Sequence, residues 1–262
     1  MYYCGATGAI EERVFQVGLA VSSDGIHFER SPENPIYSFG DQRTSIVTPT
    51  VLRTTDARSV HEHGKLRMWF SATDFADSPN ALHESTSTDG LHWDEPSPSQ
   101  LKHVYAPTVL REDTPDGSKY RMWYIDGSGG SWIVRHASSR DGRSWSVTEV
   151  PSVILHQEWE KNNLFYPTVV KADGVYLMWY GSYWADHPHM TASGFAASLD
   201  GIKWYKSPHN PVHRPDSSRP WESHYVTSQS LMRLTSASGV TSLTFRSNGY
   251  TARPSISAGP PS

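Results

Sequence analysis

The sequence has one cysteine, no long hydrophobic run and no secretory leader. Because Cys4 is the single cysteine among 262 residues, an intrachain disulfide framework and a cysteine-based zinc site are excluded, and a reducing compartment is expected. No stretch approaches the roughly 18 apolar residues of a membrane-spanning helix, and residues 1–14 lack a basic start and an apolar centre. These absences predict a cytoplasmic protein without a membrane partner.

Strong charge is also missing. The formal net charge is -4, and lysine and arginine form no block, which argues against a nucleic-acid partner. The sequence has no Gly-x-Ser-x-Gly elbow, no Walker loop and no dinucleotide fingerprint after a strand. A kinase or a nucleotide-dependent oxidoreductase is therefore a poor interpretation, and no cofactor is expected. A neutral, polar ligand fits this composition better.

Aromatic and turn-forming residues are abundant. The chain contains 37% hydrophobic and 12% aromatic residues, with 19 Gly and 18 Pro, so it can bury a sizeable core and form many turns. All-β domains commonly reach this length as single units. We expect one domain over residues 1–250 and a polar C-terminal tail over residues 251–262.

One aromatic stretch occurs three times. Each copy follows a Pro-Thr-Val segment and precedes a Ser-x-Asp-Gly turn; the copies are Lys65–Phe70, Lys119–Tyr124 and Val175–Tyr180. The turn aspartates are 65, 52 and 59 residues apart, at Asp24, Asp89, Asp141 and Asp200. These lengths suit one four-stranded propeller blade with variable loops. The repeated Met-Trp residues are expected in the core, and the aspartates are expected to form turns.

The repeat predicts an all-β protein, a five-bladed β-propeller whose first and last blades are incomplete. The chain opens on Tyr2–Gly5, which matches the second strand of a blade, and its last unit offers strands at residues 228–234 and 240–246. In an alternative arrangement the C-terminal strand completes the first blade, leaving four blades and a spare strand. We favour five.

The order of these motifs resembles the five-bladed propeller glycosidases: the arabinanase, xylosidase and fructosidase group, with the related mannoside phosphorylases. The resemblance covers nearly the whole chain and rests on Pro-Thr-Val, Tyr-x-Met-Trp-Tyr, Ser-x-Asp-Gly-x-x-Trp and Asn-Pro-Val. It implies a glycoside hydrolase-like enzyme that holds a glycan or glycosylated small molecule in its central funnel. It also implies three carboxylates on the innermost strands of the first three blades, as nucleophile or base, helper and general acid.

The sequence departs from that pattern at the inner strands. The residues before the three prolines contain no acid; they are Ile46–Thr48, Val104–Ala106 and Leu164–Tyr166. The strand expected to carry the first carboxylate would precede Met1. A two-carboxylate hydrolysis would therefore need acids from other positions.

Loops at the expected funnel face supply such acids. The candidate acid/base residues are Asp74, Asp126, Glu160, Asp186 and Glu222, and the candidate substrate-binding residues are Arg43, His103, Trp132, Trp184, His187, His189 and His224. Trp132 and Trp184 could stack on the apolar face of a sugar ring. Glu160 and Glu222 each follow a tryptophan, and each is either a general acid or a structural residue tied to a backbone amide.

Three alternatives stay open. Asp186, His187 and His189 resemble a partial metal-ligand set that His103 and His224 could complete, or they form a solvated loop; no metal is assigned, and a structural cation in the channel is the alternative. The chain could instead be a non-catalytic sugar-binding propeller. It could also act on another small metabolite with histidine as acid or base.

Overall fold

The computed structural model describes residues 1–252, apart from residues 8, 10–12, 56–57, 76–78, 113–114, 116, 118, 227–228, 236–240 and 248–249. The described residues form β-strands and one short 3-10 turn, η2 (Pro220–Glu222). None of the described segments is a helix that could cross a membrane. The all-β prediction is therefore confirmed, whereas residues 253–262 of the predicted tail lie outside the described part.

The strands assemble into sheets that follow the chain order. The first sheet contains β1 (Tyr2–Gly5), β2 (Gln16–Val21) and β3 (Glu29–Arg30). The second contains β4 (Ser45–Val51), β7 (Lys65–Thr73), β8 (Ala81–Ser87) and β9 (Leu101–Lys102), with β6 (His61–Glu62) beside β7. The third contains β5 (Arg53–Thr54), β10 (Val104–Arg111), β11 (Tyr120–Asp126), β12 (Ile133–Ser139) and β13 (Ser146–Val147).

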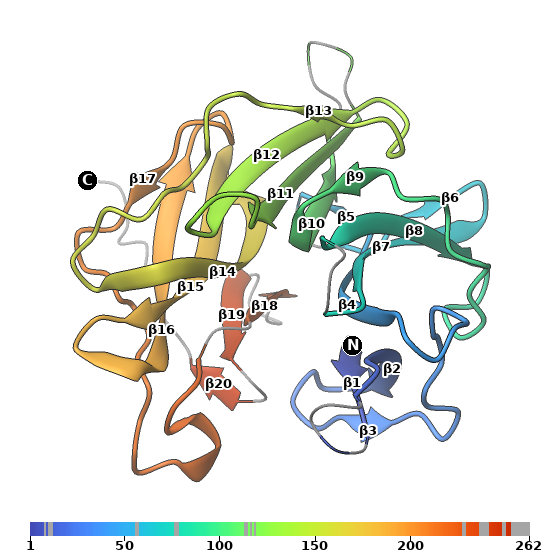
Figure 1. Cartoon of the computed structure of the whole chain (residues 1–262), viewed down its shortest axis with the longest axis horizontal. Helices are drawn as coiled ribbons and strands as arrows, with labels where there is room; N and C mark the ends of the chain where they lie inside the picture. The colour runs from blue at the N-terminus through green and yellow to red at the C-terminus, as the bar shows by residue number, and fades with distance from the viewer. Residues whose placement is uncertain are drawn as a thin grey trace.

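Two further sheets complete the described chain. The fourth contains β14 (Glu160–Ala172), β15 (Val175–Trp184), β16 (His187–Ser198) and β17 (Tyr205–Lys206). The last contains β18 (Gln229–Thr235), β19 (Thr241–Ser247) and β20 (Tyr250–Ala252). Figure 1 shows the sheets following one another around a common centre, which is a β-propeller arrangement. The inner strands β4, β10 and β14 contact one another in sequence.

The predicted blade count needs a correction. Counting the sheets whose side chains are described, the structure shows four blades rather than five. These blades are built on β1, β4, β10 and β14. The three-stranded sheet β18–β20 follows them and is described by its backbone alone. Its strand β18 pairs with β19, so the described strands do not show the alternative closure of β18 onto β1.

Two of the three repeated tryptophans join their blade to the next one. Trp69 and Trp123 are fully buried, and their indole N–H groups donate to the carbonyl oxygens of Gly142 at 2.9 Å and Gly201 at 2.8 Å. Both acceptors lie in the Asp-Gly turn of the following blade. The predicted core role of these two residues is confirmed, and a buried indole with its N–H satisfied is stabilising in this position.

The aspartates of the turns act as predicted. The Asp141 carboxylate accepts the backbone N–H groups of Arg143 and Ser144, each at 2.8 Å, and Ser139 donates to the same oxygen. Backbone hydrogen bonds from Ser144 and Arg143 lower the pKa of Asp141 to about 2. The carboxylate is thereby committed to the turn, as expected of an Asx-type hairpin.

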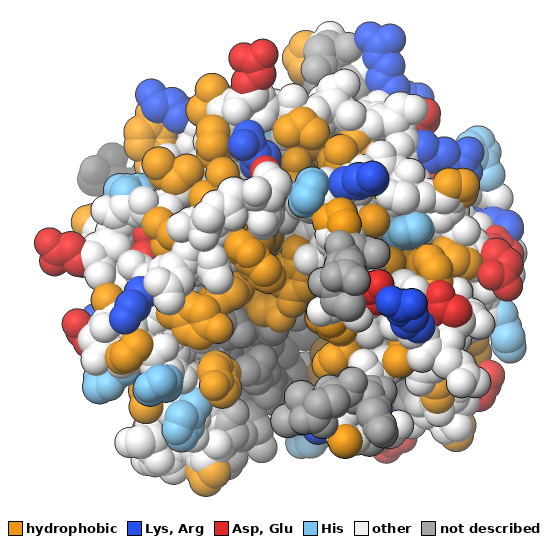
Figure 2. Space-filling view, in the orientation of Figure 1, with side chains coloured by type: hydrophobic (Ala, Val, Ile, Leu, Met, Phe, Trp, Pro, Cys, Tyr) orange, Lys and Arg blue, Asp and Glu red, His pale blue; other side chains and the backbone are white. Residues whose placement is uncertain are grey.

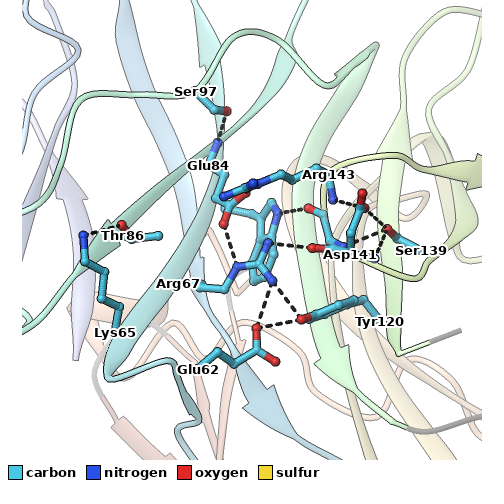
Figure 3. A network of polar contacts seen from close by, with 12 residues as sticks. Glu62, Lys65, Arg67, Glu84, Thr86, Ser97, Tyr120, Ser139, Asp141 and Arg143 are labelled. Carbon is cyan, nitrogen blue, oxygen red and sulfur yellow. Dashed lines mark hydrogen bonds and ion pairs between the residues drawn. The ribbon is translucent and has the colours of Figure 1, made fainter.

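Arg67 forms a buried polar network between the second and third blades (Figure 3). Its guanidinium donates to Glu84 at 2.6 Å, to Glu62 at 2.9 Å and to the Asp141 carbonyl at 3.0 Å. The Tyr120 hydroxyl donates to Glu62 at 2.6 Å. Because these charges are satisfied by one another, Glu62 and Glu84 are structural carboxylates and not free acids.

Candidate functional site

Each inner strand carries a bulge directly before the proline of its Pro-Thr-Val segment. The pairing register of β4, β10 and β14 shifts at this point. The residues before the prolines have positive φ values of 53° at Thr48, 51° at Ala106 and 43° at Tyr166. Left-handed backbone is uncommon outside glycine, and it is an outlier for a β-branched or bulky residue. The same strained bulge occurs in three neighbouring blades. This repetition indicates that the inner strands serve a function at this height along the propeller axis.

Side chains from four blades meet at this level. The hydroxyl groups of Tyr105 and Tyr166 are hydrogen-bonded at 2.7 Å. Thr48 Oγ1 accepts the backbone N–H of Ala106 at 3.2 Å. Cys4 has a backbone hydrogen bond with Thr48 and lies close enough to both tyrosines to affect their ionisation. The propeller axis is therefore lined by a thiol and hydroxyl groups, where the family resemblance implied carboxylates.

Burial keeps these groups neutral. It raises the pKa of the Cys4 thiol to about 12, and it raises the pKa of Tyr105, with a further contribution from the adjacent Tyr166. Burial also raises the pKa of Tyr166, although the hydrogen bond with Tyr105 acts in the opposite direction. At neutral pH the pair therefore offers hydrogen-bond donors and acceptors and supplies no phenolate nucleophile.

Aromatic rings surround the tyrosine pair. We call this set the axial aromatic cluster; its members are Tyr105, Trp132, Phe165, Tyr166 and Tyr183, all of them half-buried. The ring centroids of Tyr105 and Trp132 are 5.2 Å apart, and those of Phe165 and Tyr183 are 5.0 Å apart. Figure 2 shows hydrophobic side chains gathered at the centre of the molecule, where the surface is hollowed. The cluster thus combines apolar ring surface with two hydroxyl groups.

Trp132 is held in this cluster by its own backbone. Its N–H donates to Asn163 Oδ1 at 3.0 Å, and its carbonyl accepts the N–H of Leu164 at 3.0 Å. A Cβ at Gly127 would lie 2.9 Å from the indole nitrogen, so glycine is needed for this approach. Trp132, which the sequence analysis predicts to bind substrate, therefore lies beside the tyrosine pair, and its binding role stays a prediction.

Three of the predicted acid/base residues are committed to ion pairs. The Glu160 side chain has 0% exposure and accepts Lys206 Nζ at 2.5 Å, the Tyr180 hydroxyl at 2.8 Å and the His156 backbone N–H at 2.9 Å. The structural alternative for Glu160, a tie to backbone amides, is therefore confirmed. These contacts occupy the carboxylate that the predicted general acid would need free.

Asp126 and Glu222 are also paired. Asp126 is buried and accepts Arg135 Nε at 2.6 Å. Burial alone would raise the pKa of Asp126, but hydrogen bonds from Ser128 and Arg135 outweigh it and the pKa lies below its ordinary value. Glu222 is buried and accepts Arg219 at 2.6 Å. The pKa of Asp126 is thus lowered, whereas a general acid needs a raised pKa near neutral pH.

Two predicted acids retain contact with solvent, in separate places. Asp74 lines a cavity of about 160 Å³ together with His83, and its carboxylate is 3.5 Å from Arg43. Asp186 lines a larger cavity of about 440 Å³ beside Trp184. Asp74 and Asp186 therefore line different cavities.

The predicted histidines do not assemble a metal site. His103, His187, His189 and His224 are exposed. The ring centroids of His187 and Trp184 are 4.4 Å apart with the rings tilted by 54°, while His224 is hydrogen-bonded to Ser223 at 2.8 Å. Across the described part of the chain, no group of three or more His, Cys, Asp or Glu side chains could hold a metal ion. The alternative in which His103 and His224 complete a ligand set with Asp186, His187 and His189 is therefore not formed among the described residues.

The residues that sequence reasoning missed are those of the pre-proline positions. Tyr105, Phe165 and Tyr166 were noted there only as positions without an acid. Their signal was an aromatic side chain placed just before a proline that starts a repeated strand segment. Interpreting those positions as ligand-facing in their own right would have found most of the axial aromatic cluster.

The chain was compared with known protein families and with known sequences. No family model matches the chain. Two uncharacterized proteins of Mycobacterium tuberculosis, from strains CDC 1551 / Oshkosh and ATCC 25618 / H37Rv, are each 26% identical over 181 residues, covering 63% of this chain. The chain spans 56% of the length of these relatives.

Solved structures are similar over most or all of the chain. A glycoside hydrolase superposes with a TM-score of 0.75 at 14% identity, covering 100% of this chain and 87% of its own. The fold is that of glycoside hydrolase-type propellers. An N-acetylgalactosamine deacetylase from F. plautii, in complex with blood group B trisaccharide, superposes with a TM-score of 0.65 at 13% identity, covering 92% of this chain and 73% of its own.

Proposed function

We propose that this protein is a carbohydrate-active, glycoside hydrolase-like enzyme that binds a glycan or glycosylated small molecule over the axial aromatic cluster. The observation that carries the proposal is the Tyr105–Tyr166 hydroxyl pair, held on strained inner strands among half-buried aromatic rings. Similarity to glycoside hydrolase propellers and to a deacetylase solved with a trisaccharide supports the ligand class.

The cluster has the chemistry that a neutral sugar requires. Aromatic rings pack against the apolar C–H face of a pyranose or furanose ring, and Trp132 and Tyr183 present such rings from different blades. The neutral hydroxyls of Tyr105 and Tyr166 can donate to and accept from sugar hydroxyl groups. The absence of ionised groups among these five side chains favours a neutral ring over a charged one.

Hydrolysis further requires a proton donor and a nucleophile or base. Among the predicted acids, Asp126, Glu160 and Glu222 are already paired with cations, namely Arg135, Lys206 and Arg219. Asp74 and Asp186 retain contact with solvent, and we propose these two as the remaining acid/base candidates. A substrate would have to extend from the axis towards one of them.

A non-catalytic sugar-binding propeller is the second candidate function. It is supported by one specific observation: the described inner strands β4, β10 and β14 present no carboxylate at or just before their pre-proline bulges. In such a protein the axial aromatic cluster would bind a glycan and leave its glycosidic bonds intact.

A combined binding and turnover experiment separates these functions. Calorimetry with neutral oligosaccharides and hydrolysis of nitrophenyl glycosides would be measured for the native protein and for Trp132→Ala, Asp74→Asn and Asp186→Asn. We expect binding to weaken about tenfold in Trp132→Ala, and turnover to be lost in one or both Asp variants. Binding without turnover would establish the sugar-binding alternative, and neither binding nor turnover with any oligosaccharide would contradict both.

A further inference from the structure

We infer that a pocket away from the propeller axis is a second binding site for a neutral sugar. The pocket has a volume of about 440 Å³ and lies between the loop before β14, the end of β15 and the segment after β17; we call it the rim pocket. This volume lies within the range of roughly 300–1,000 Å³ of small-molecule sites. The inference shares the carbohydrate ligand class of the proposed function, although it concerns a different location.

The floor of the rim pocket is rigid. The Asn210 side-chain amide donates to Gln157 Oε1 at 2.9 Å, to the Tyr180 hydroxyl at 3.1 Å and to the Phe195 carbonyl at 3.1 Å. Trp159 donates to the same Gln157 oxygen at 2.9 Å. Because these groups are already fixed by hydrogen bonds, a ligand entering the pocket would meet a preformed surface.

The walls define the ligand class. Trp184 supplies an apolar wall, and the Arg214 guanidinium lies 5.6 Å from its ring centroid. Glu158, Asp186 and Arg214 are exposed and line the same cavity. The carboxylates disfavour an anion, and Arg214 beside the Trp184 ring disfavours a cation. The cavity thus combines carboxylate acceptors, the guanidinium donors of Arg214 and the aromatic ring of Trp184. This combination suits a ring that carries several hydroxyl groups.

The rim pocket is distinct from the axial aromatic cluster. None of the residues lining it belongs to the cluster. The two sites lie on opposite sides of the end of β15, because Tyr183 packs against Phe165 while the next residue, Trp184, lines the pocket. Figure 2 shows histidine side chains gathered over β16 and the chain after β17, close to this rim. The two sites therefore share no lining residue, although an axial substrate that reached Asp186 would enter the rim pocket.

Fluorine NMR of the protein labelled with 5-fluorotryptophan tests the inference directly. The Trp184 and Trp132 signals would be assigned from Trp184→Phe and Trp132→Phe. The probes are xylo-, arabino-, manno- and galacto-oligosaccharides, with galacturonate and glucosamine as charged controls. We expect at least one neutral probe to shift the Trp184 signal, and Asp186→Asn with Glu158→Gln to weaken that binding about tenfold. Trp132→Ala should leave the Trp184 response unchanged.

The outcomes separate the two sites. A Trp184 response without a Trp132 response would support the rim pocket and contradict axial binding. A Trp132 response without a Trp184 response would support axial binding and contradict the rim pocket. The inference is overturned if no neutral probe moves the Trp184 signal, if only galacturonate or glucosamine does, or if Trp132→Ala abolishes the response. Unfolding curves of each variant would show that it remains folded, and Arg214→Ala provides a second rim variant on an exposed side chain.

Discussion

The hydroxyl groups of Tyr105 and Tyr166 lie 2.7 Å apart, although 61 residues separate them in the sequence. Each residue comes from the innermost strand of its blade, next to a bulge with positive φ. The propeller arrangement thus brings two neutral phenols together at the axis. This pair lies at the level of the inner strands where the resemblance to propeller glycosidases implied carboxylates.

Removing either hydroxyl tests its role in ligand binding. In Tyr166→Phe the ring is retained and one hydrogen bond is lost, so we expect the free energy of unfolding to fall by only about 1 kcal/mol. Oligosaccharide binding should weaken about tenfold, because the sugar loses a hydroxyl partner. Calorimetry and urea unfolding would measure both. Tyr205→Phe, on a side chain that is 62% exposed on β17, is the matched control, and equal binding by both variants would contradict the assignment.

Glu160 and Glu158 form a matched pair for a stability test. In Glu160→Gln the buried Lys206 ammonium loses its counter-charge, and we expect a loss of about 3 kcal/mol from the free energy of unfolding. Burial already lowers the pKa of Lys206, so the variant should be least stable at low pH, where the ammonium must stay charged. Glu158→Gln, on an exposed side chain, should change stability by less than about 0.5 kcal/mol. Comparable urea midpoints for the two variants would show that the Glu160 pair is not structural.

Arg67 can be replaced by the residue that occurs at the same position of another repeat, Leu177. We expect Arg67→Leu to cost about 3–5 kcal/mol, because it leaves Glu62 and Glu84 buried without their shared cation. Arg143→Leu, on a side chain that is 70% exposed, should cost less than about 1 kcal/mol. Thermal and urea unfolding would measure the difference. If Arg67→Leu proved as stable as the native protein, the network in Figure 3 would not stabilise the joint between the blades.

Alanine variants at two glycines with positive φ can separate the cost of left-handed backbone from the cost of steric crowding by the new Cβ. A Cβ at Gly142 would lie 2.6 Å from Arg67 and 2.9 Å from Trp69, whereas a Cβ at Gly64 would meet nothing within 4 Å. We expect Gly64→Ala to cost about 1–2 kcal/mol from the left-handed backbone alone. Gly142→Ala should cost clearly more, since it also disturbs the joint between the blades. Equal unfolding midpoints would contradict this ranking.

Stability should decrease on acidification in two stages. Burial lowers the pKa of His83 and of His213 from 6.5, the latter despite the nearby Glu222. The unfolded chain then binds more protons than the folded one, so stability falls as the pH drops below about 6.5. A second loss follows below about 4.5, where Glu62 and Glu112 have lowered pKa values. Urea unfolding between about pH 2 and pH 8 would measure both, and His83→Gln should flatten the upper stage.

The repeat and its turns could be predicted from contiguous residues. Spacing and turn chemistry are local properties, so the Asp-Gly hairpins and the buried Trp69 and Trp123 followed from the sequence. The fate of the carboxylates could not be predicted in this way. Lys206 lies 46 residues from Glu160 in the sequence, and no residue near Glu160 indicates that the two will pair.

By itself, the sequence determined an all-β propeller with a neutral, polar ligand as the expected partner, because alternation, turn residues and net charge act within each repeat. Only the tertiary structure decided where a ligand could bind. Cys4, Thr48, Tyr105 and Tyr166 come from four different blades, and they meet only once those blades surround a common axis. Contacts between residues so far apart in the chain depend on the packing of whole sheets, which no local pattern encodes.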